Sequence, residues 1–539
     1  MVESSSDPGD LGSKSNGFRL PLYNRSLDWL WRFIESRTHI SKWPYRPQPE
    51  FSFNPSYWTG AFVAVAFMLQ VLTGLLLLFY YDPSVVSTTT GGPPQAWAST
   101  YYIIHSTPFG WLLLSSHLYG AYACIMLAFV HFFRGYYTGA YKRPREVSWM
   151  LGTLLLGCML GMGFTGYLLP YTALSVGATD VGLALINSVP VLGPILYPLV
   201  QGNGTYQGLL SRMFALHVVL IPVVLLTLLY AHVTLFESHG IAPRASSDPS
   251  AKRVLTEADD RKLGGSWFPR VFLYMLKWGL VYVGVLLLIA STFLVNLPAA
   301  FGSQNQGGAS PEPDWYFLWL YKVADFQYVT PTAAVVLVGL LGAFILLLPW
   351  IELAVGRVVP RLKGSRTHPR DRPFALFTAT FLLSFFGLLS VWGGVMPGVT
   401  IPVSMYVTYL GTLALVQALV IGFYYLRYRR RYAARTARSQ LGPPATSPAP
   451  RPAASSPTPL TAPIREWSAR FWDGSTAMVV MTLAGLLVPL AFILDQRTYV
   501  GAANEQAFGL ATAIMAFSVA GIVHVVDRAL FRYRSAAPT

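Results

Sequence analysis

The sequence predicts an all-α polytopic membrane protein with about ten spans. Only 12% of its 539 residues are charged and 53% are hydrophobic, whereas a soluble domain carries roughly 25% charge. Long apolar runs recur along the chain, and basic residues cluster in alternate connections between them. The positive-inside rule explains this distribution, so the net charge of +15 does not indicate nucleic-acid binding. Cys124 and Cys158 lie inside apolar runs, so they indicate neither disulfides nor a zinc site.

Each predicted span has about 20 apolar residues, enough to cross ~30 Å of hydrocarbon. The spans are 59–80, 111–135, 148–169, 211–235, 272–295, 331–354, 374–393, 402–427, 475–494 and 506–527. The basic connections all fall on one face if both termini are cytoplasmic, as an even number of spans requires. We therefore expect a multi-pass protein of the cell membrane.

The spans divide the chain into five predicted regions. These are a cytoplasmic N-terminal segment 1–58, a first bundle 59–240, a second group of spans 241–432, a linker 433–466 and two extra C-terminal helices 467–539. Residues 23–36 form either an amphipathic interfacial helix or an ordinary surface helix. Residues 439–464 are rich in Pro, Ala and Ser and too poor in apolar bulk to fold.

Four histidines lie inside predicted spans. His117 and His131 are fourteen residues apart in span two, and His217 and His232 are fifteen apart in span four. These spacings place each pair on nearly one helix face, with ~21 Å between the two depths. Spans two and four insert in the same direction, so we expect His117 to meet His217 near the outer face and His131 to meet His232 near the inner face. Two bis-histidine sites favour two non-covalent haem b groups, although a single intramembrane histidine is more often a packing residue.

Glycines repeat the same spacing in the neighbouring spans. Span one carries Gly60 and Gly74, and span three carries Gly152 and Gly166. Glycine allows a flat group to approach a helix backbone closely, and ordinary helix packing is the alternative for either pair alone. Arg134 follows His131 by one turn, where it either neutralises a haem propionate or is simply a boundary arginine of the inner face.

These residues resemble the cytochrome b family of quinol–cytochrome c oxidoreductases (cytochrome bc complexes) over residues 20–430. Besides the histidines, the resemblance rests on Gln70-Val71-Leu72-Thr73-Gly74, Gly166-Tyr167-Leu168-Leu169-Pro170, Arg212 ahead of His217, and Pro313-Asp314-Trp315-Tyr316. It implies a di-haem four-helix bundle with further transmembrane helices, and Arg212 near the outer haem.

The resemblance also implies a quinol-oxidation site at Pro313, Asp314, Trp315 and Tyr316. Quinol loses two protons as it loses two electrons, so a carboxylate is needed as proton acceptor. Asp314 stands where the family usually has a glutamate, so its reach is one methylene shorter. Glu312 and Asp325 are nearby alternatives.

Partner subunits follow from the same resemblance. One electron from quinol leaves through a Rieske iron–sulfur protein towards a c-type cytochrome. The other passes through the outer and inner haems to a quinone at the inner face, with protons released outside and taken up inside. The family implies a homodimer within a larger complex. Glu237, His239 and Lys277 lie at the depth of the inner quinone site, although each alone is as well explained as a solvated boundary residue.

Two positions depart from the family. Leu114 replaces an arginine that precedes the first haem ligand in relatives, so the outer propionates need another cation or a proton. Trp58 occupies the place of the cysteine that binds a covalent haem in the chloroplast branch, so we expect no covalent haem c. Two other classes compete with this interpretation, a proton-coupled transporter and a di-haem anchor of a dehydrogenase.

Overall fold

The computed structural model describes most of the predicted bundle. The described residues are Gln48, 52–142, 144–202, 204–241, 270–293, 295–303, 312–359, 372–440 and 502–531. The predicted helix at 23–36 and the predicted span at 475–494 lie outside these residues, as does the linker from residue 441 onwards.

Eight helices in the described residues are long and apolar enough to cross a membrane. They are α2 (Thr59–Leu77), α4 (Gly110–Thr138), α5 (Glu146–Leu168), the continuous unit α8–η4–α9 (Tyr206–His239), α11 (Phe272–Thr292), α13 (Pro331–Val358), α14 (Pro373–Val395) and α15 (Val403–Gln440). They confirm the first eight predicted spans and the all-helical fold class. Helix α15 continues to Gln440, past the predicted start of the linker at residue 433.

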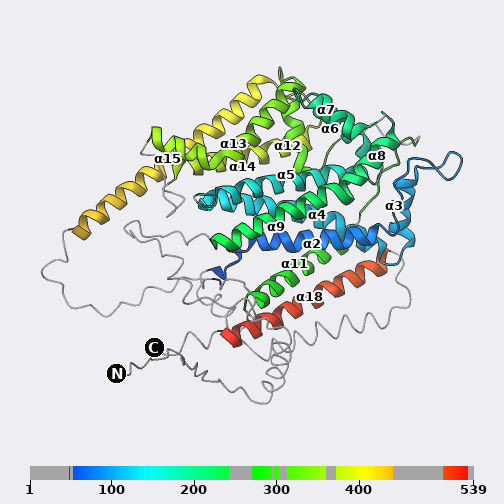
Figure 1. Ribbon diagram of the computed structural model, residues 1–539, viewed down its shortest axis with the longest axis horizontal. Helices are drawn as coiled ribbons and strands as arrows, with labels where there is room; N and C mark the ends of the chain where they lie inside the picture. The colour runs from blue at the N-terminus through cyan, green and yellow to red at the C-terminus, as the bar shows by residue number, and fades with distance from the viewer. Residues whose placement is uncertain are drawn as a thin grey trace, which may run out of the picture.

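Four shorter helices lie in connections between the spans that were predicted to be loops. They are α3 (Gln95–Ser106), α6 (Ala173–Asn187), α7 (Gly193–Gln201) and α12 (Trp315–Ala324). Helices α3, α6, α7 and α8 gather at the right of Figure 1. We call this end of the bundle the outer end, after its predicted orientation, and the opposite end the inner end.

The first four spans, α2, α4, α5 and α9, form one bundle, and α12 to α15 form a second group beside it (Figure 1). A buried cluster joins the two groups at the inner end, with Phe132, Tyr136 and Trp149 from the bundle packed against Leu348 and Leu382. The second group therefore rests on the faces of α4 and α5.

A polar network ties the same two groups together. Glu352 of α13 accepts hydrogen bonds from the Arg372 guanidinium at 3.2 Å and pairs with Lys142 at 2.9 Å. Tyr141, in the turn after α4, donates to Glu352 and accepts from Arg372. Helix α4 ends at Gly139, whose φ of 64° favours glycine. A side chain at Gly139 would also collide with Arg372.

The C-terminal helix α18 (Ala502–Phe531) lies alongside α11 (Figure 1). Its middle portion, Phe508–Gly521, is apolar. Gly509 packs on Ser291 near the outer end of α11, and His524 lies 3.4 Å from Lys277 near the inner end. The two helices are therefore antiparallel, and α18, which lies outside the range of the family resemblance, packs on α11.

Candidate functional site: two histidine pairs and a part-buried aspartate

The four intramembrane histidines form two pairs in the structure. The ring centroids of His117 and His217 are 6.5 Å apart, and those of His131 and His232 are also 6.5 Å apart. The rings within each pair are close to perpendicular, at 78° and 85°. We call His117 and His217 the outer pair and His131 and His232 the inner pair.

Each histidine packs against one of the four glycines. A Cβ built on the glycine would come within 3.3 Å of an imidazole atom in every case. The contacts join Gly60 to His131, Gly74 to His117, Gly152 to His232 and Gly166 to His217. The nearest groups to the glycines are therefore the imidazole rings themselves.

The π-helical turn η4 (Leu216–Leu220) explains the fifteen-residue spacing in α9. A π-turn accommodates one residue more than an α-turn. Pro222 follows it and has no N–H to donate to the carbonyl of Val218, which favours this local rearrangement. Fifteen residues between His217 and His232 therefore occupy about the same helical register as the fourteen between His117 and His131.

Hydrogen bonds at Nδ1 determine the tautomer of the outer pair. His217 Nδ1 lies 3.0 Å from the carbonyl oxygen of Met162, which can only accept, so Nδ1 carries the proton. Thr73 donates its own hydroxyl proton to the carbonyl of Leu69, so it accepts from His117 Nδ1 at 2.9 Å. Both Nε2 atoms are then left with a lone pair.

The inner pair is held less symmetrically. Thr59 Oγ1 lies 2.9 Å from His131 Nδ1, while His232 has no side-chain partner of this kind and its ring faces the backbone of Ser148. Arg134 stacks on the ring of Tyr57 at 4.6 Å, and its buried Nε has no hydrogen-bond partner within the described residues. A cationic side chain with an unused buried donor beside the inner pair suits an anionic group.

A packed apolar layer separates the two pairs. Phe67, Cys124, Met159 and Leu225 belong to one buried cluster. Each lies about midway in its helix between the two histidines or the two glycines of that helix. Cys124, for example, is seven residues from both His117 and His131. The bundle thus holds two sites at two depths with side chains filling the space between them.

Asp314 contacts the bundle at Tyr122, which lies on α4 between His117 and Cys124 of the apolar layer. Its Oδ1 accepts a hydrogen bond from the Tyr122 hydroxyl at 2.6 Å, and its Oδ2 accepts one from Tyr316 at 2.8 Å. The Tyr316 ring lies over Gly163, where a Cβ would be 2.7 Å from it. Burial raises the pKa of Asp314, and the two hydroxyl donors partly oppose that shift.

The other acidic candidates lie in different surroundings. Asp325 forms an ion pair with Lys322 at 3.1 Å, and the fully buried Lys322 ammonium also donates to two backbone carbonyls. Glu312 accepts a hydrogen bond from Tyr167 through its backbone carbonyl, at 2.8 Å. Only Asp314, among these three, has both carboxylate oxygens bonded to tyrosine hydroxyls within the described residues.

Several other predicted residues lie apart from the histidines. Arg212 is exposed and donates to the carbonyl of Gly208 within α8, and none of its contacts in the described residues joins it to the outer pair. His239 is in the last turn of α9, and Lys277 contacts His524 of α18. Leu114 packs in an apolar cluster with Trp111, and Trp58 is buried against Tyr274.

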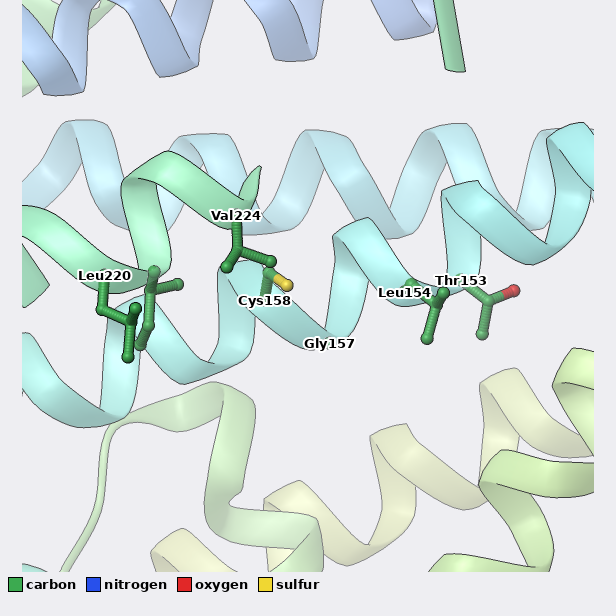
Figure 2. Close-up of a pocket in the computed structure, with 7 residues that line it drawn as sticks. Thr153, Leu154, Gly157, Cys158, Leu220 and Val224 are labelled. Atoms are coloured by element: carbon green, nitrogen blue, oxygen red, sulfur yellow. The ribbon is translucent and has the colours of Figure 1, made fainter. Parts of the chain in front are cut away.

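An apolar groove of about 410 Å³ lies between α5 and α9 at a depth between the two pairs (Figure 2). Leu154, Leu220 and Val224 line it and are each more than 40% exposed. Exposed apolar side chains in a span face lipid. The groove therefore belongs to the lipid-facing surface of the bundle and not to the space between the histidines.

Comparisons with known proteins agree with this geometry. The family described as Cytochrome b(N-terminal)/b6/petB matches residues 122–302. A protein described as Cytochrome b, from Sulfolobus acidocaldarius, is 32% identical over 416 residues, which cover 72% of this chain and 70% of the relative. The chain belongs to the cytochrome b family of the cytochrome bc complexes.

Two further relatives extend the comparison. The menaquinol:cytochrome c reductase cytochrome b subunit of Geobacillus thermodenitrificans is 34% identical over 233 residues, covering 41% of this chain and 99% of that protein. A solved structure described as hyperthermophilic respiratory Complex III matches with a TM-score of 0.54 at 25% identity. It covers 74% of this chain and 97% of the matched chain.

Membership of the cytochrome b family implies haem b binding, and both pairs fit that group. Two iron–nitrogen bonds of about 2 Å each, plus about 1 Å from each nitrogen to its ring centre, separate the ring centroids by about 6 Å. The observed 6.5 Å in each pair is close to this value. The outer-pair tautomer, the four glycine contacts and the unused Nε of Arg134 agree with it.

The sequence did not predict Tyr122, Gly163 or the hydrogen bonds of the threonines beside the histidines. Thr59, Thr73 and Thr165 each immediately precede one of the four glycines and contact a histidine Nδ1. That repeated Thr-Gly pair is visible in the sequence and is a usable signal. Tyr122 has no such signal, because its partner is almost two hundred residues away.

Proposed function

We propose that this chain is the subunit of a cytochrome bc complex that oxidises quinol at the outer end and reduces quinone at the inner end. Electrons cross the membrane between the two sites, with protons released outside and taken up in the cytoplasm. The observation that carries the proposal is the placement of Asp314, a part-buried carboxylate that is held by two tyrosine hydroxyls, one of them on the helix that carries His117.

Each pair would hold one non-covalent haem b, with His117 and His217 as outer ligands and His131 and His232 as inner ligands. When bound, the haems supply one-electron transfer across the bilayer. The hydrogen bonds from Nδ1 of His117 and His217 orient these imidazoles and raise the basicity of Nε2. Arg134 provides a cation for an anionic group at the inner site.

Asp314 would accept a proton from quinol. A carboxylate oxygen has two lone-pair positions, so each oxygen retains one after accepting from its tyrosine. Burial raises the pKa of Asp314, which brings its basicity closer to that of an efficient proton acceptor at neutral pH. Pro313, Trp315 and Tyr316 would shape the pocket around it.

The remaining assignments rest on the family and on charge. We propose that a Rieske iron–sulfur protein and a c-type cytochrome accept electrons at the outer end, and that two copies of the chain associate in a larger complex. Glu237, His239 and Lys277 are the proposed inner quinone residues. Both termini would lie in the cytoplasm, because the basic connections fall on one face.

Haem binding is tested by a reduced-minus-oxidised spectrum of the purified complex, with the haem b count per polypeptide. Two haems per chain are expected. His217→Ala and His232→Ala should each remove one haem, from the outer and the inner site respectively. A protein without an α-band would contradict the proposal and favour a transporter.

Asp314→Asn should lower quinol oxidation by about a hundredfold or more, because the amide cannot accept the proton at neutral pH. The measurement is quinol-dependent cytochrome c reduction by the assembled complex, with the haem count unchanged. Glu312→Gln is the matched control and should retain activity. A large loss in Glu312→Gln together with an active Asp314→Asn would move the proton-accepting role to Glu312.

A further inference from the structure

The carboxylate of Asp314 has a partner that the Pro-Asp-Trp-Tyr motif does not contain. Tyr122 lies on α4, five residues after His117, and its hydroxyl donates to Asp314 Oδ1 at 2.6 Å. Five residues of α-helix correspond to about 7.5 Å along the axis. Tyr122 therefore connects the proposed proton acceptor to the same helix that carries an outer-pair histidine.

The two tyrosines that hold Asp314 differ in what they fix. Tyr316 is only two residues away and belongs to α12, and it contacts the bundle by packing its ring on Gly163 of α5. Tyr122 belongs to a different element, and its hydrogen bond fixes the carboxylate relative to α4. The orientation of Asp314 towards α4 therefore depends on Tyr122 more than on its neighbour in the motif.

The short side chain of Asp314 explains why a partner on α4 is needed. Asp314 precedes the first residue of α12, but its side chain makes no capping hydrogen bond to that helix and points towards α4 instead. An aspartate reaches less far than a glutamate by one methylene. A tyrosine on the facing helix supplies the missing reach from the other side.

We propose that Tyr122 is a positioning residue for quinol oxidation, which holds the short carboxylate of Asp314 against α4, the helix that carries His117. The inference rests on the proposed function of Asp314 and adds a residue that the motif does not contain. The competing explanation is aromatic packing, because the Tyr122 ring also lies edge-on to Tyr119 and Tyr316 at 6.2 and 6.3 Å.

Tyr122→Phe separates these explanations, since it keeps the ring and removes only the hydroxyl. In the purified complex we expect kcat for a short-chain menaquinol analogue to fall about tenfold while KM stays within about twofold. Tyr119→Phe, three residues earlier on α4, is the matched control and should behave as wild type. An unchanged kcat in Tyr122→Phe would overturn the proposal.

The pH profile gives a second readout. The Tyr122 hydrogen bond lowers the pKa of Asp314, so its loss raises that pKa. Asp314 accepts a proton only when ionised, so activity is lost as pH falls through its pKa. The acid limb of kcat should therefore move to higher pH in Tyr122→Phe, by about one unit. A lower kcat with an unmoved acid limb would show that the Tyr122 hydroxyl does not act through the carboxylate of Asp314, and would contradict the proposal.

A double-mutant cycle tests the argument from length. Asp314→Glu restores the methylene, so the hydroxyl of Tyr122 should matter less in that background. We expect Tyr122→Phe to cost about tenfold with aspartate and less than about threefold with glutamate. Equal losses in the two backgrounds would contradict a role in compensating the short side chain.

The outcomes also separate this inference from the proposed function. If Asp314→Asn leaves the wild-type rate intact, the proposed role of Asp314 fails whatever Tyr122 does. If Asp314→Asn abolishes activity and Tyr122→Phe is silent, only the positioning role fails. Each variant is compared at an equal haem count, which shows that the bundle has assembled.

Discussion

Single atoms decide whether the bundle can hold its imidazoles. Gly166 is the clearest case: a Cβ there would lie 2.6 Å from Cε1 of His217, with Nδ1 and Nε2 also within 3.3 Å. The ring has little room to give way, because His217 Nδ1 is already bonded to Met162. The absence of one methyl group at this position is therefore a condition for the outer pair.

Gly166→Ala should reduce the haem count from two per chain to one, with loss of the outer haem. The expected cause is displacement of the His217 ring. The measurement is the haem b content of the purified complex together with its low-temperature difference spectrum. Gly157→Ala on the same helix is the control, since a Cβ there meets nothing within 4 Å. Two haems with an unshifted spectrum in Gly166→Ala would contradict this prediction.

At the scale of the element, the π-turn in α9 sets the register of a whole helix. In a regular α-helix, a spacing of fifteen residues would rotate His232 by about 60° relative to His217. A spacing of fourteen residues would rotate it by about 40° in the opposite direction. The extra residue is absorbed between Leu216 and Leu220, before Pro222. The remainder of α9 is a regular α-helix, so the deletion of one residue there would rotate His232 away from His131.

Two deletions with the same final spacing should therefore give different results. Deleting Val219 together with Pro222→Ala removes the π-turn and should leave both haems bound. Deleting Leu226 keeps the π-turn and rotates His232 by about 100°, so the inner haem should be lost. Both deleted side chains are exposed. The haem count of each purified variant decides the matter, and equal counts would show that the π-turn does not set the register.

On the scale of the whole molecule, a buried ion network joins the haem-binding bundle to the group that carries α12. Glu352 and Arg372 are 6% and 2% exposed, and Lys142 and Tyr141 reach them from the turn after α4. Removing one partner from such a network leaves the remaining buried charges less well compensated. The position of Asp314 against α4 depends on how these two halves meet.

Arg372→Met should lower the free energy of unfolding by about 3 kcal/mol or less, because buried Glu352 then keeps Lys142 and the Tyr141 hydroxyl as its partners. Arg372→Met with Glu352→Leu should cost less than the sum of the two single changes. The measurement is thermal unfolding of the detergent-solubilised protein, followed by loss of the bound-haem spectrum. The exposed Arg427 provides a control substitution, Arg427→Met, that should be neutral. Additive losses would show that the two groups act independently.

The spans and the two histidine pairs were predictable because the membrane imposes strong constraints on local sequence. Apolar length identified eight helices to within a few residues at most ends. The fourteen-residue repeat of His117 and His131, and of the two glycine pairs, follows from the helical period alone. The surface helices α3, α6 and α7 were not predicted, because they lack the run of about 20 apolar residues that identifies a span.

The sequence by itself determined the fold class, the family and the four histidines, because these depend on composition and on spacings within one helix. Only the tertiary structure decided which hydroxyl meets Asp314, how a π-turn reconciles fifteen residues with fourteen, and that α18 lies on α11. Those features are contacts between residues far apart in the chain or small changes of helical register. Neither leaves a local pattern, since the packing of the folded chain alone brings the groups together.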